Sequence, residues 1–433
     1  MAFNKSIAEE LRERLPSHID VNTFHSKGLR VLLSNFRIKP KINENKCFVI
    51  GKKILDTKDM DVKQQIRYLF EIQIIWNYIR VNLITDYEKE IPGICIEKNI
   101  EFQERMVGDM EQIRNAWHKE MKKINSVKEI NIDFTDMLYF PYQLLDSEDF
   151  PKYDIVTLDE QQDANTLQKE LALRYIKKSG RFVVVGDSRQ CIYGFQGSSL
   201  EVFKSLQSYP NTIVLPLDIT YRCGKNIVEE ARKVFNNGIV AAPNAIDGIV
   251  RKGEFDEAEN GDFVLCRNNL PLATVFLYLL EMGKKATIKG KDYGDALVAL
   301  VDKIRYIEDL DAMCEKKISE LKERGLTDIQ AKNNPSYVTL LEKCTILEML
   351  YKNWGDMKKL EDNIKEIYKD DTEGIVLSTI HKSKGLEADR VFLLNRSLIP
   401  SKYANTEEAL YNEKCLLFVA ITRARKELVY CNV

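Results

Sequence analysis

The feature that most constrains the fold is a series of short apolar runs that end in polar residues. A strand buried on both faces of a parallel sheet is a continuous apolar run, and ligand-binding groups follow the carboxyl ends of such strands. Each run here is followed by a helical pattern or a polar loop, an alternation typical of α/β domains. The sequence therefore predicts parallel strands at residues 153–158, 181–185, 212–217, 262–266, 374–378, 390–394 and 427–431.

Two long blocks with helical patterns separate these predicted strands. Residues 56–128 and 292–369 carry no strand signal, and the second block is rich in Glu, Lys and Leu. Solvated helices are the expected interpretation of such a block, and a coiled partner surface is the alternative. A chain of 433 residues is long enough for two or three domains. We therefore expect two α/β cores, at residues 1–210 and 211–433, each with one helical block as an insertion.

Composition excludes several classes of protein. The chain has no apolar run long enough for a membrane span, and residues 1–16 form a mixed-charge stretch unlike a signal peptide. The nine cysteines lack CxxC spacing and the four histidines are dispersed, which argues against a metal site in those residues. We expect a cytoplasmic protein with reduced thiols and no membrane partner, in the host cytoplasm if it is phage-encoded. Since 64 basic residues nearly balance 66 acidic ones, net charge neither supports nor opposes nucleic-acid binding.

The predicted strand at residues 153–158 delivers two adjacent carboxylates, Asp159 and Glu160, to its carboxyl end. This pattern suits a nucleotide site, in which Asp159 would bind Mg²⁺ and Glu160 would act as general base or position the attacking water. For the pair taken alone, an acidic surface turn is the alternative.

A second strand pattern is followed by a comparable set of polar and aromatic residues. Gly186 and Asp187 end the strand, and Gln190, Tyr193 and Phe195 follow. Together with the acidic pair, this segment resembles motifs II and III of superfamily 1 helicases of the UvrD/Rep group. The resemblance implies that Gln190 senses the γ-phosphate and that the two aromatic side chains stack on bases of a single strand, at ~1 to 3 kcal/mol per base. A core position is the alternative for Phe195.

Further segments resemble motifs of the same family in the expected order. Asn4 lies in a segment similar to motif Ia, and Thr23 and His25 lie in one similar to motif Ib. Both motifs usually touch the DNA strand, although His25 is also suited to capping a turn. Residues 133–138, Asp-Phe-Thr-Asp-Met-Leu, match the Asp-Phe-x-Asp-Leu-Leu element that precedes motif II.

Two arginines in the second half of the chain resemble phosphate contacts of this family. Arg222 lies in a segment similar to motif IV, which implies contact with the γ-phosphate. Arg423 lies in a segment similar to motif VI, which makes it the second arginine finger. Such a finger contributes ~10³ to 10⁵ in rate by stabilising charge on the transferred phosphoryl group.

Residues 377–392 closely match motif V. The resemblance implies that Thr379 and His381 meet the DNA and that Glu387 contacts the ribose of the nucleotide.

Three positions depart from the family pattern. Gln161 replaces a small residue in motif II, Gln196 replaces an arginine in motif III, and Thr220 replaces an asparagine in motif IV. We expect neutral or tuning effects, and Gln196 is the change most suited to weaken coupling between the nucleotide and the DNA.

The phosphate-binding loop of the family, motif I, has no match in this sequence. That loop ends in Gly-Lys-Thr or Gly-Lys-Ser, and the Gly-Lys pairs here are followed by Lys, Asn, Lys and Asp, so none supplies the Mg²⁺-binding hydroxyl. We therefore expect the first core to lack the strand and helix of the loop and to leave apolar sheet surface uncovered. A longer gene product or a second polypeptide is expected to supply the loop, and the isolated chain is expected to hydrolyse ATP negligibly.

The resemblance as a whole implies two RecA-like cores and an ATP- and Mg²⁺-dependent DNA helicase or translocase. Such a motor moves on single-stranded DNA, 3′ to 5′ in the best-known members, and separates duplex DNA. The alternative is a non-catalytic DNA-binding remnant or subunit of such a helicase. Retention of Asp159, Glu160, Arg222 and Arg423 favours the motor, because these residues have no obvious structural use without ATP.

Overall fold

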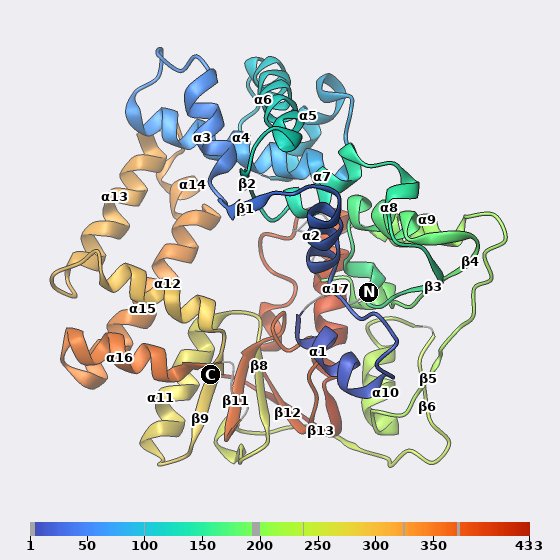
Figure 1. Ribbon diagram of the computed structural model, residues 1–433. Helices are drawn as coiled ribbons and strands as arrows, with labels where there is room; N and C mark the ends of the chain where they lie inside the picture. The colour runs from blue at the N-terminus through green and yellow to red at the C-terminus, as the bar shows by residue number, and fades with distance from the viewer. Residues whose placement is uncertain (1–4, 99, 193–199, 237, 324, 370–372) are drawn as a thin grey trace. The chain divides into compact units, whose positions relative to one another are not determined.

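The computed structural model describes residues 5–98, 100–192, 200–236, 238–323, 325–369 and 373–433 (Figure 1). The chain divides into two compact units, Met1–Val214 and Leu215–Val433, which we call unit 1 and unit 2. Both contain parallel strands connected by helices, so the predicted α/β class is confirmed.

In its described residues, unit 1 is mainly helical and has two pairs of parallel strands. β1 (Lys39–Ile42) pairs with β2 (Glu129–Ile132), and β3 (Tyr153–Leu158) pairs with β4 (Ile176–Val184). Its helices are α1 (Lys5–Arg14), α2 (Phe24–Asn35), α3 (Lys46–Ile54), α4 (Val62–Asn82), α5 (Tyr87–Glu97), α6 (Arg105–Lys122), α7 (Asp136–Leu144), α8 (Thr166–Arg174) and α9 (Leu200–Gln207). The predicted helical block at residues 56–128 contains α4, α5 and α6, which lie together with α3 at the top of Figure 1.

The longest helix of unit 1, α4, begins and ends at residues suited to those positions. Asp61 caps its first turn in a capping box with Gln64, and Leu83 ends it in a left-handed conformation. One face of α4 packs into the core, where the rings of Trp76 and Trp117, both fully buried, lie 5.7 Å apart. The exposed apolar side chains of α4 recur every four residues, at Val62, Ile66, Phe70 and Ile74.

The β3–β4 pair buries one face and exposes apolar residues on the other. Val156 and Leu158 are buried in the core of unit 1. Ile155, Val183 and Val185 retain 59%, 43% and 41% exposure. One face of this strand pair therefore carries apolar side chains at the surface of unit 1.

The prediction of a strand at residues 212–217 is wrong. These residues form no strand, and Ile213, Leu215 and Leu217 are each more than three-quarters exposed. A strand needs a neighbour to satisfy its backbone N–H and C=O groups, and no described residue pairs with this run. Only the short β5 (Ile219–Thr220) that follows finds a partner, in β6 (Val240–Ala241).

Unit 2 contains a seven-stranded parallel sheet in the order β10-β9-β11-β8-β12-β13-β7. Its strands are β7 (Ile249–Lys252), β8 (Phe263–Cys266), β9 (Ala286–Lys289), β10 (Tyr368–Lys369), β11 (Ile375–Thr379), β12 (Ala388–Leu394) and β13 (Ala424–Cys431). β8, β11, β12 and β13 confirm the four strands predicted in this half of the chain. Every residue of β8 is buried, as a central parallel strand requires.

The second predicted helical block, residues 292–369, lies in unit 2. The unit contains α10 (Lys225–Arg232), α11 (Asn269–Glu281), α12 (Lys291–Val301), α13 (Asp309–Glu323), α14 (Asp328–Lys332), α15 (Pro335–Trp354), α16 (Met357–Ile367) and α17 (Glu407–Ile421). The run from α12 to α16 confirms helices throughout most of residues 292–369. Across the described part of the chain, no helix combines the length and the apolar composition that a membrane crossing requires.

Candidate nucleotide and DNA site

The acidic pair of unit 1 lies in a strained turn at the carboxyl end of β3. Glu160 has φ 52° and ψ 43°, a left-handed conformation that costs a residue other than glycine about 1–3 kcal/mol. Its backbone N–H donates to Asp159 Oδ1 at 3.0 Å. Burial and then the negative charge of Glu160 raise the pKa of Asp159. A divalent cation would offset both effects, so this pair fits Mg²⁺.

A buried glutamine joins the acidic pair to the second predicted segment. Gln162 is 1% exposed, and its Nε2 donates to Glu160 Oε2 at 2.5 Å. Its Oε1 accepts the backbone N–H of Asp187 at 3.0 Å. The Asp187 carboxylate in turn accepts from Gln190 Nε2 at 3.2 Å. The structure therefore brings Glu160 and Gln190 into one hydrogen-bonded chain, with Gln162 and Asp187 between them.

Gln161, one of the departures from the family pattern, has a less favourable environment. It is 1% exposed, and neither atom of its side-chain amide hydrogen-bonds to a described residue. A buried amide without a partner costs about 1–3 kcal/mol. Neither this environment nor the link through Gln162 was predicted from the sequence.

In unit 2, Arg222 and Glu387 form an ion pair. Arg222 Nε donates to Glu387 Oε2, and the two side chains are 37% and 36% exposed. Arg425 also reaches this site, at 3.5 Å from Glu387 and 2.6 Å from Asp389. Sequence reasoning missed Arg425, although it stands two residues after Arg423 in the same motif.

Arg423 is buried within unit 2. Its side chain is 1% exposed, with Nε donating to the Val419 carbonyl at 3.1 Å and Nη1 to the Leu386 carbonyl at 3.0 Å. These bonds connect α17 to the segment before β12. In the conformation described, the guanidinium is thus directed at backbone carbonyls, and the predicted finger role stays a prediction.

The predicted DNA residues of unit 2 follow the end of β11. Thr379 ends the strand, and its carbonyl accepts the backbone N–H groups of Lys382 and Ser383 at 3.0 and 3.1 Å, which forms a tight turn around His381. Burial, followed by the positive charge of Arg267, lowers the pKa of His381 to about 4. His381 is therefore neutral at physiological pH.

In unit 1, two of the predicted DNA residues begin α2. Thr23 is the N-cap, and its Oγ1 accepts the Ser26 backbone N–H at 3.2 Å. His25 lies in the first turn, and burial lowers its pKa. Gly28 lets α2 approach α7 closely, because a Cβ at this position would collide with the Met137 carbonyl.

The structure adds one aromatic residue to this region. Phe134 is 52% exposed, and its ring meets that of His25 edge-on, with centroids 6.3 Å apart and planes at 86°. Phe134 belongs to the Asp-Phe-Thr-Asp element, so the sequence did contain a signal for it. Three predicted site residues, Asn4, Tyr193 and Phe195, lie outside the described residues.

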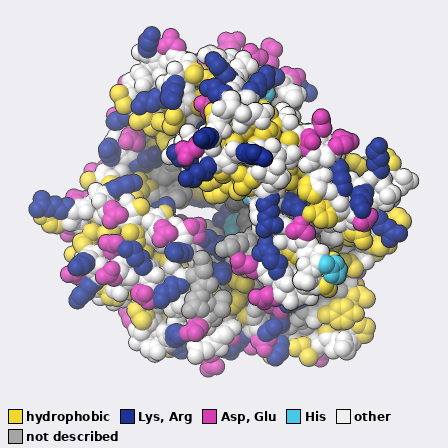
Figure 2. All heavy atoms as spheres, viewed as in Figure 1, with side chains coloured by type: hydrophobic (Ala, Val, Ile, Leu, Met, Phe, Trp, Pro, Cys, Tyr) yellow, Lys and Arg dark blue, Asp and Glu magenta, His cyan; other side chains and the backbone are white. Residues whose placement is uncertain are grey.

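Charged side chains of both signs are mixed over the face drawn in Figure 2. This distribution agrees with the near balance of 64 basic and 66 acidic residues.

Two family profiles match the chain. One described as the UvrD/REP helicase N-terminal domain covers residues 1–210, and one described as the UvrD-like helicase C-terminal domain covers residues 111–432.

Curated relatives carry helicase names. The chain is 20% identical to an ATP-dependent DNA helicase Rep of Buchnera aphidicola, over 100% of this chain and 87% of the relative. It is 27% identical to ATP-dependent DNA helicase PcrA of Bacillus subtilis, over 55% of this chain and 33% of the relative. It is 26% identical to F-box DNA helicase protein 1 of Schizosaccharomyces pombe, over 69% of this chain and 37% of the relative. The match thus spans most of the Rep protein and about a third of the other two.

Proposed function

The chain belongs to the UvrD/REP helicase family, and from this premise we propose that it is the body of an ATP-dependent motor that moves on single-stranded DNA. The observation that carries the proposal is the hydrogen-bonded chain from Glu160 through Gln162 and Asp187 to Gln190. It joins a carboxylate suited to activating water to a side chain suited to sensing a γ-phosphate.

In unit 1, we propose that Asp159 holds Mg²⁺ and that Glu160 accepts a proton from the attacking water. The bound metal ion would neutralise charge on the phosphates. Gln190 would read the presence of the γ-phosphate through a hydrogen bond, and the Asp187 carboxylate keeps its amide oriented.

In unit 2, we propose that Arg222 and Arg423 contact the γ-phosphate and that Glu387 contacts the ribose. The ion pair between Arg222 and Glu387 keeps two nucleotide-binding side chains together. For Arg423 to act as a finger, its bonds to the Val419 and Leu386 carbonyls have to be exchanged for bonds to phosphate oxygens.

For DNA, we propose contacts from Thr23, His25 and Phe134 in unit 1 and from Thr379 and His381 in unit 2. Phe134 offers an exposed ring of the kind on which a base stacks. Asn4, Tyr193 and Phe195 are proposed for the same strand from their motifs alone, and so is movement in the 3′ to 5′ direction.

We also propose that unit 1 and unit 2 correspond to the first and second RecA-like cores. The boundary would lie near residues 210–211, and the insertions would be residues 56–128 and 292–369.

A second candidate function is a DNA-binding subunit with little turnover of its own. It is favoured by the Gly-Lys pairs of the sequence, none of which is followed by Ser or Thr. On this proposal a separate polypeptide segment supplies the phosphate-binding loop, and residues 1–433 alone bind single-stranded DNA but hydrolyse ATP slowly.

The test combines two measurements on residues 1–433 and on a Glu160→Gln variant. Anisotropy of a labelled oligothymidylate measures binding of single-stranded DNA, and phosphate release with and without DNA measures ATP hydrolysis. We expect both proteins to bind the oligonucleotide, and hydrolysis by both to stay near background. Failure of both proteins to bind would overturn the proposal. DNA-stimulated hydrolysis that is lost in Glu160→Gln would contradict the expectation of slow hydrolysis and overturn the second candidate, and it would support the motor.

A further inference from the structure

The turn at residues 133–136, between β2 and α7, is held by its own two carboxylates. The backbone N–H of Asp136 donates to Asp133 Oδ1 at 2.8 Å, and the backbone N–H of Asp133 donates to Asp136 Oδ2 at 3.3 Å. These reciprocal bonds fix both ends of the turn. The two residues between them, Phe134 and Thr135, are thereby presented at the surface.

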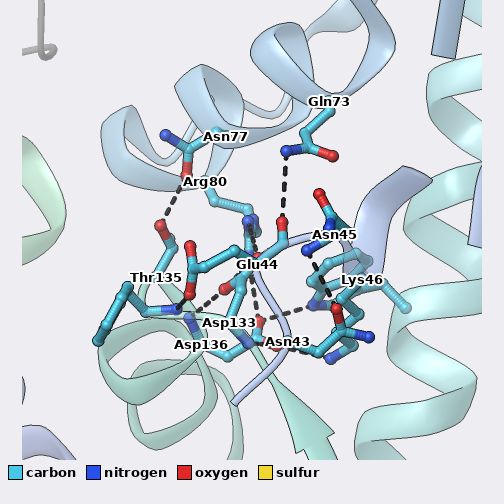
Figure 3. A network of polar contacts seen from close by, with 12 residues as sticks. Asn43, Glu44, Asn45, Lys46, Gln73, Asn77, Arg80, Asp133, Thr135 and Asp136 are labelled. Atoms are coloured by element: carbon cyan, nitrogen blue, oxygen red, sulfur yellow. Dashed lines mark hydrogen bonds and ion pairs between the residues drawn. The ribbon is translucent and has the colours of Figure 1, made fainter. Parts of the chain in front are cut away.

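Two buried cations neutralise these carboxylates (Figure 3). Arg80 donates to both carboxylate oxygens of Asp133, at 2.9 and 2.6 Å, and to Asp136 Oδ1 at 2.8 Å. Lys46 donates to Asp136 Oδ2 at 2.6 Å. All four side chains are at most 8% exposed. Because the two positive and two negative charges are paired closely, the free-energy cost of burying them is largely offset.

One face of α4 contacts this region at three points. Arg80 forms the ion pairs, Asn77 Oδ1 accepts from Thr135 Oγ1 at 2.6 Å, and Gln73 Nε2 donates to the Glu44 carbonyl at 3.3 Å. Residues 73, 77 and 80 share a face because they follow the helical spacing of three and four. The Glu44 side chain completes the contacts, with Oε1 accepting the Phe134 backbone N–H at 3.0 Å.

The polar contacts of the turn leave the Phe134 ring 52% exposed beside His25. Glu44 accepts the backbone N–H of Phe134, and Asn77 accepts the side-chain hydroxyl of the neighbouring Thr135. A ring fixed in advance loses less conformational freedom on binding than a mobile one, which strengthens stacking on a base.

We propose that Glu44, in the segment before α3, and Asn77, on α4, are positioning residues that fix the Phe134 ring beside His25 and so raise the affinity for single-stranded DNA. The inference rests on the proposed function, in which Phe134 and His25 contact DNA. It goes beyond that function because it assigns Glu44 and Asn77 a role through Phe134 and no contact with the strand.

The test measures oligothymidylate affinity for residues 1–433 with Glu44→Ala, with Asn77→Ala and with Phe134→Ala. Both positioning variants are expected to weaken binding about threefold to tenfold, a part of the full stacking contribution of one ring. Phe134→Ala is expected to weaken it more. Glu44 and Asn77 are exposed, so denaturant unfolding of the two positioning variants should match that of the wild type. Should Asn77→Ala unfold more readily, Thr135→Val removes the same hydrogen bond from the other partner.

Two controls separate positioning from charge. Glu44→Gln keeps an oxygen that accepts the Phe134 N–H and is expected to restore wild-type affinity. Glu101→Ala removes a carboxylate from an exposed loop position of the same unit. This variant should bind oligothymidylate with wild-type affinity.

Double variants give the decisive comparison. In the Phe134→Ala background, Glu44→Ala and Asn77→Ala are expected to cause no further loss of oligothymidylate affinity. All three changes act on the same interaction, the stacking of the Phe134 ring on a base. Additive losses, or wild-type affinity in both single positioning variants, would overturn the inference and leave the proposed function intact. Absence of DNA binding by the wild-type chain would instead count against the proposed function.

Discussion

At the scale of single residues, the side-chain amide of Gln161 offers a direct test of the buried site. It is buried beside the catalytic candidates, and its amide has no hydrogen bond to a described residue. Gln161→Met keeps the length of the side chain and removes both polar atoms, so we expect the free energy of unfolding to rise by about 1 kcal/mol. Denaturant unfolding of the variant measures this.

The neighbouring residue is the matched control. Gln162 is equally buried, but its amide is bonded at both atoms. Gln162→Met should therefore lower the free energy of unfolding. A lower stability for Gln161→Met as well would mean that its amide has a partner in solution.

His381 gives the prediction for pH. Its pKa in the folded chain is about 4, below the ordinary value of 6.5, because burial disfavours the charged ring. The folded state therefore binds fewer protons than the unfolded state between these values. The contribution of His381 to the free energy of unfolding is therefore fully present above pH 6.5 and declines as the pH falls towards 4. NMR titration of the ring should give a midpoint near 4, and His381→Asn should show a smaller loss of stability over this range.

Single site residues were predictable where a motif carries them in consecutive positions. Asp159 and Glu160 were identified in this way, and a hydrogen bond joins them in the structure. Arg222 and Glu387 were identified from two separate motifs, and the ion pair between them was not predicted. Their roles remain predictions. The Phe134 contact with His25 was not predictable, because it joins residues more than a hundred positions apart.

At the scale of elements, the ion pairs of Arg80 tie α4 to the turn before α7. Removing one partner of a buried network leaves a charge without compensation. Asp136→Asn is therefore expected to lower the free energy of unfolding by about 3–5 kcal/mol. Denaturant unfolding of Asp136→Asn, Lys46→Met and the double variant tests the coupling. The double variant should lose less than the sum of the two single losses, and strictly additive losses would contradict the network.

The elements also show why apolar runs predict some strands and not others. The run at residues 212–217 has a suitable pattern but no partner among the described residues, so it forms no strand. Conversely β1, β2 and β7 are short and partly charged, and they form because a partner strand accepts them. Pairing is a property of two segments, and a pattern read from one segment does not contain it.

At the scale of the whole molecule, the two units have separate hydrophobic cores. The core of unit 1 draws on residues between Phe24 and Phe182, and that of unit 2 on residues between Phe255 and Cys431. We therefore expect the fragment Leu215–Val433 to fold alone. Circular dichroism should give a helix- and strand-containing spectrum with one cooperative unfolding transition, and a spectrum of unfolded chain would contradict this expectation.

The order of strands in unit 2 has a consequence for biosynthesis. β7 pairs only with β13 among the described residues, yet the two strands leave the ribosome at opposite ends of the synthesis of this unit. β8, which is buried on both sides, must likewise wait for β11 and β12. The helices from α12 to α16 emerge in between and are able to form from local contacts. During translation the apolar strands of the nascent sheet therefore stay unpaired for a long interval, and a ribosome-associated chaperone that binds extended apolar segments would have its clearest target there.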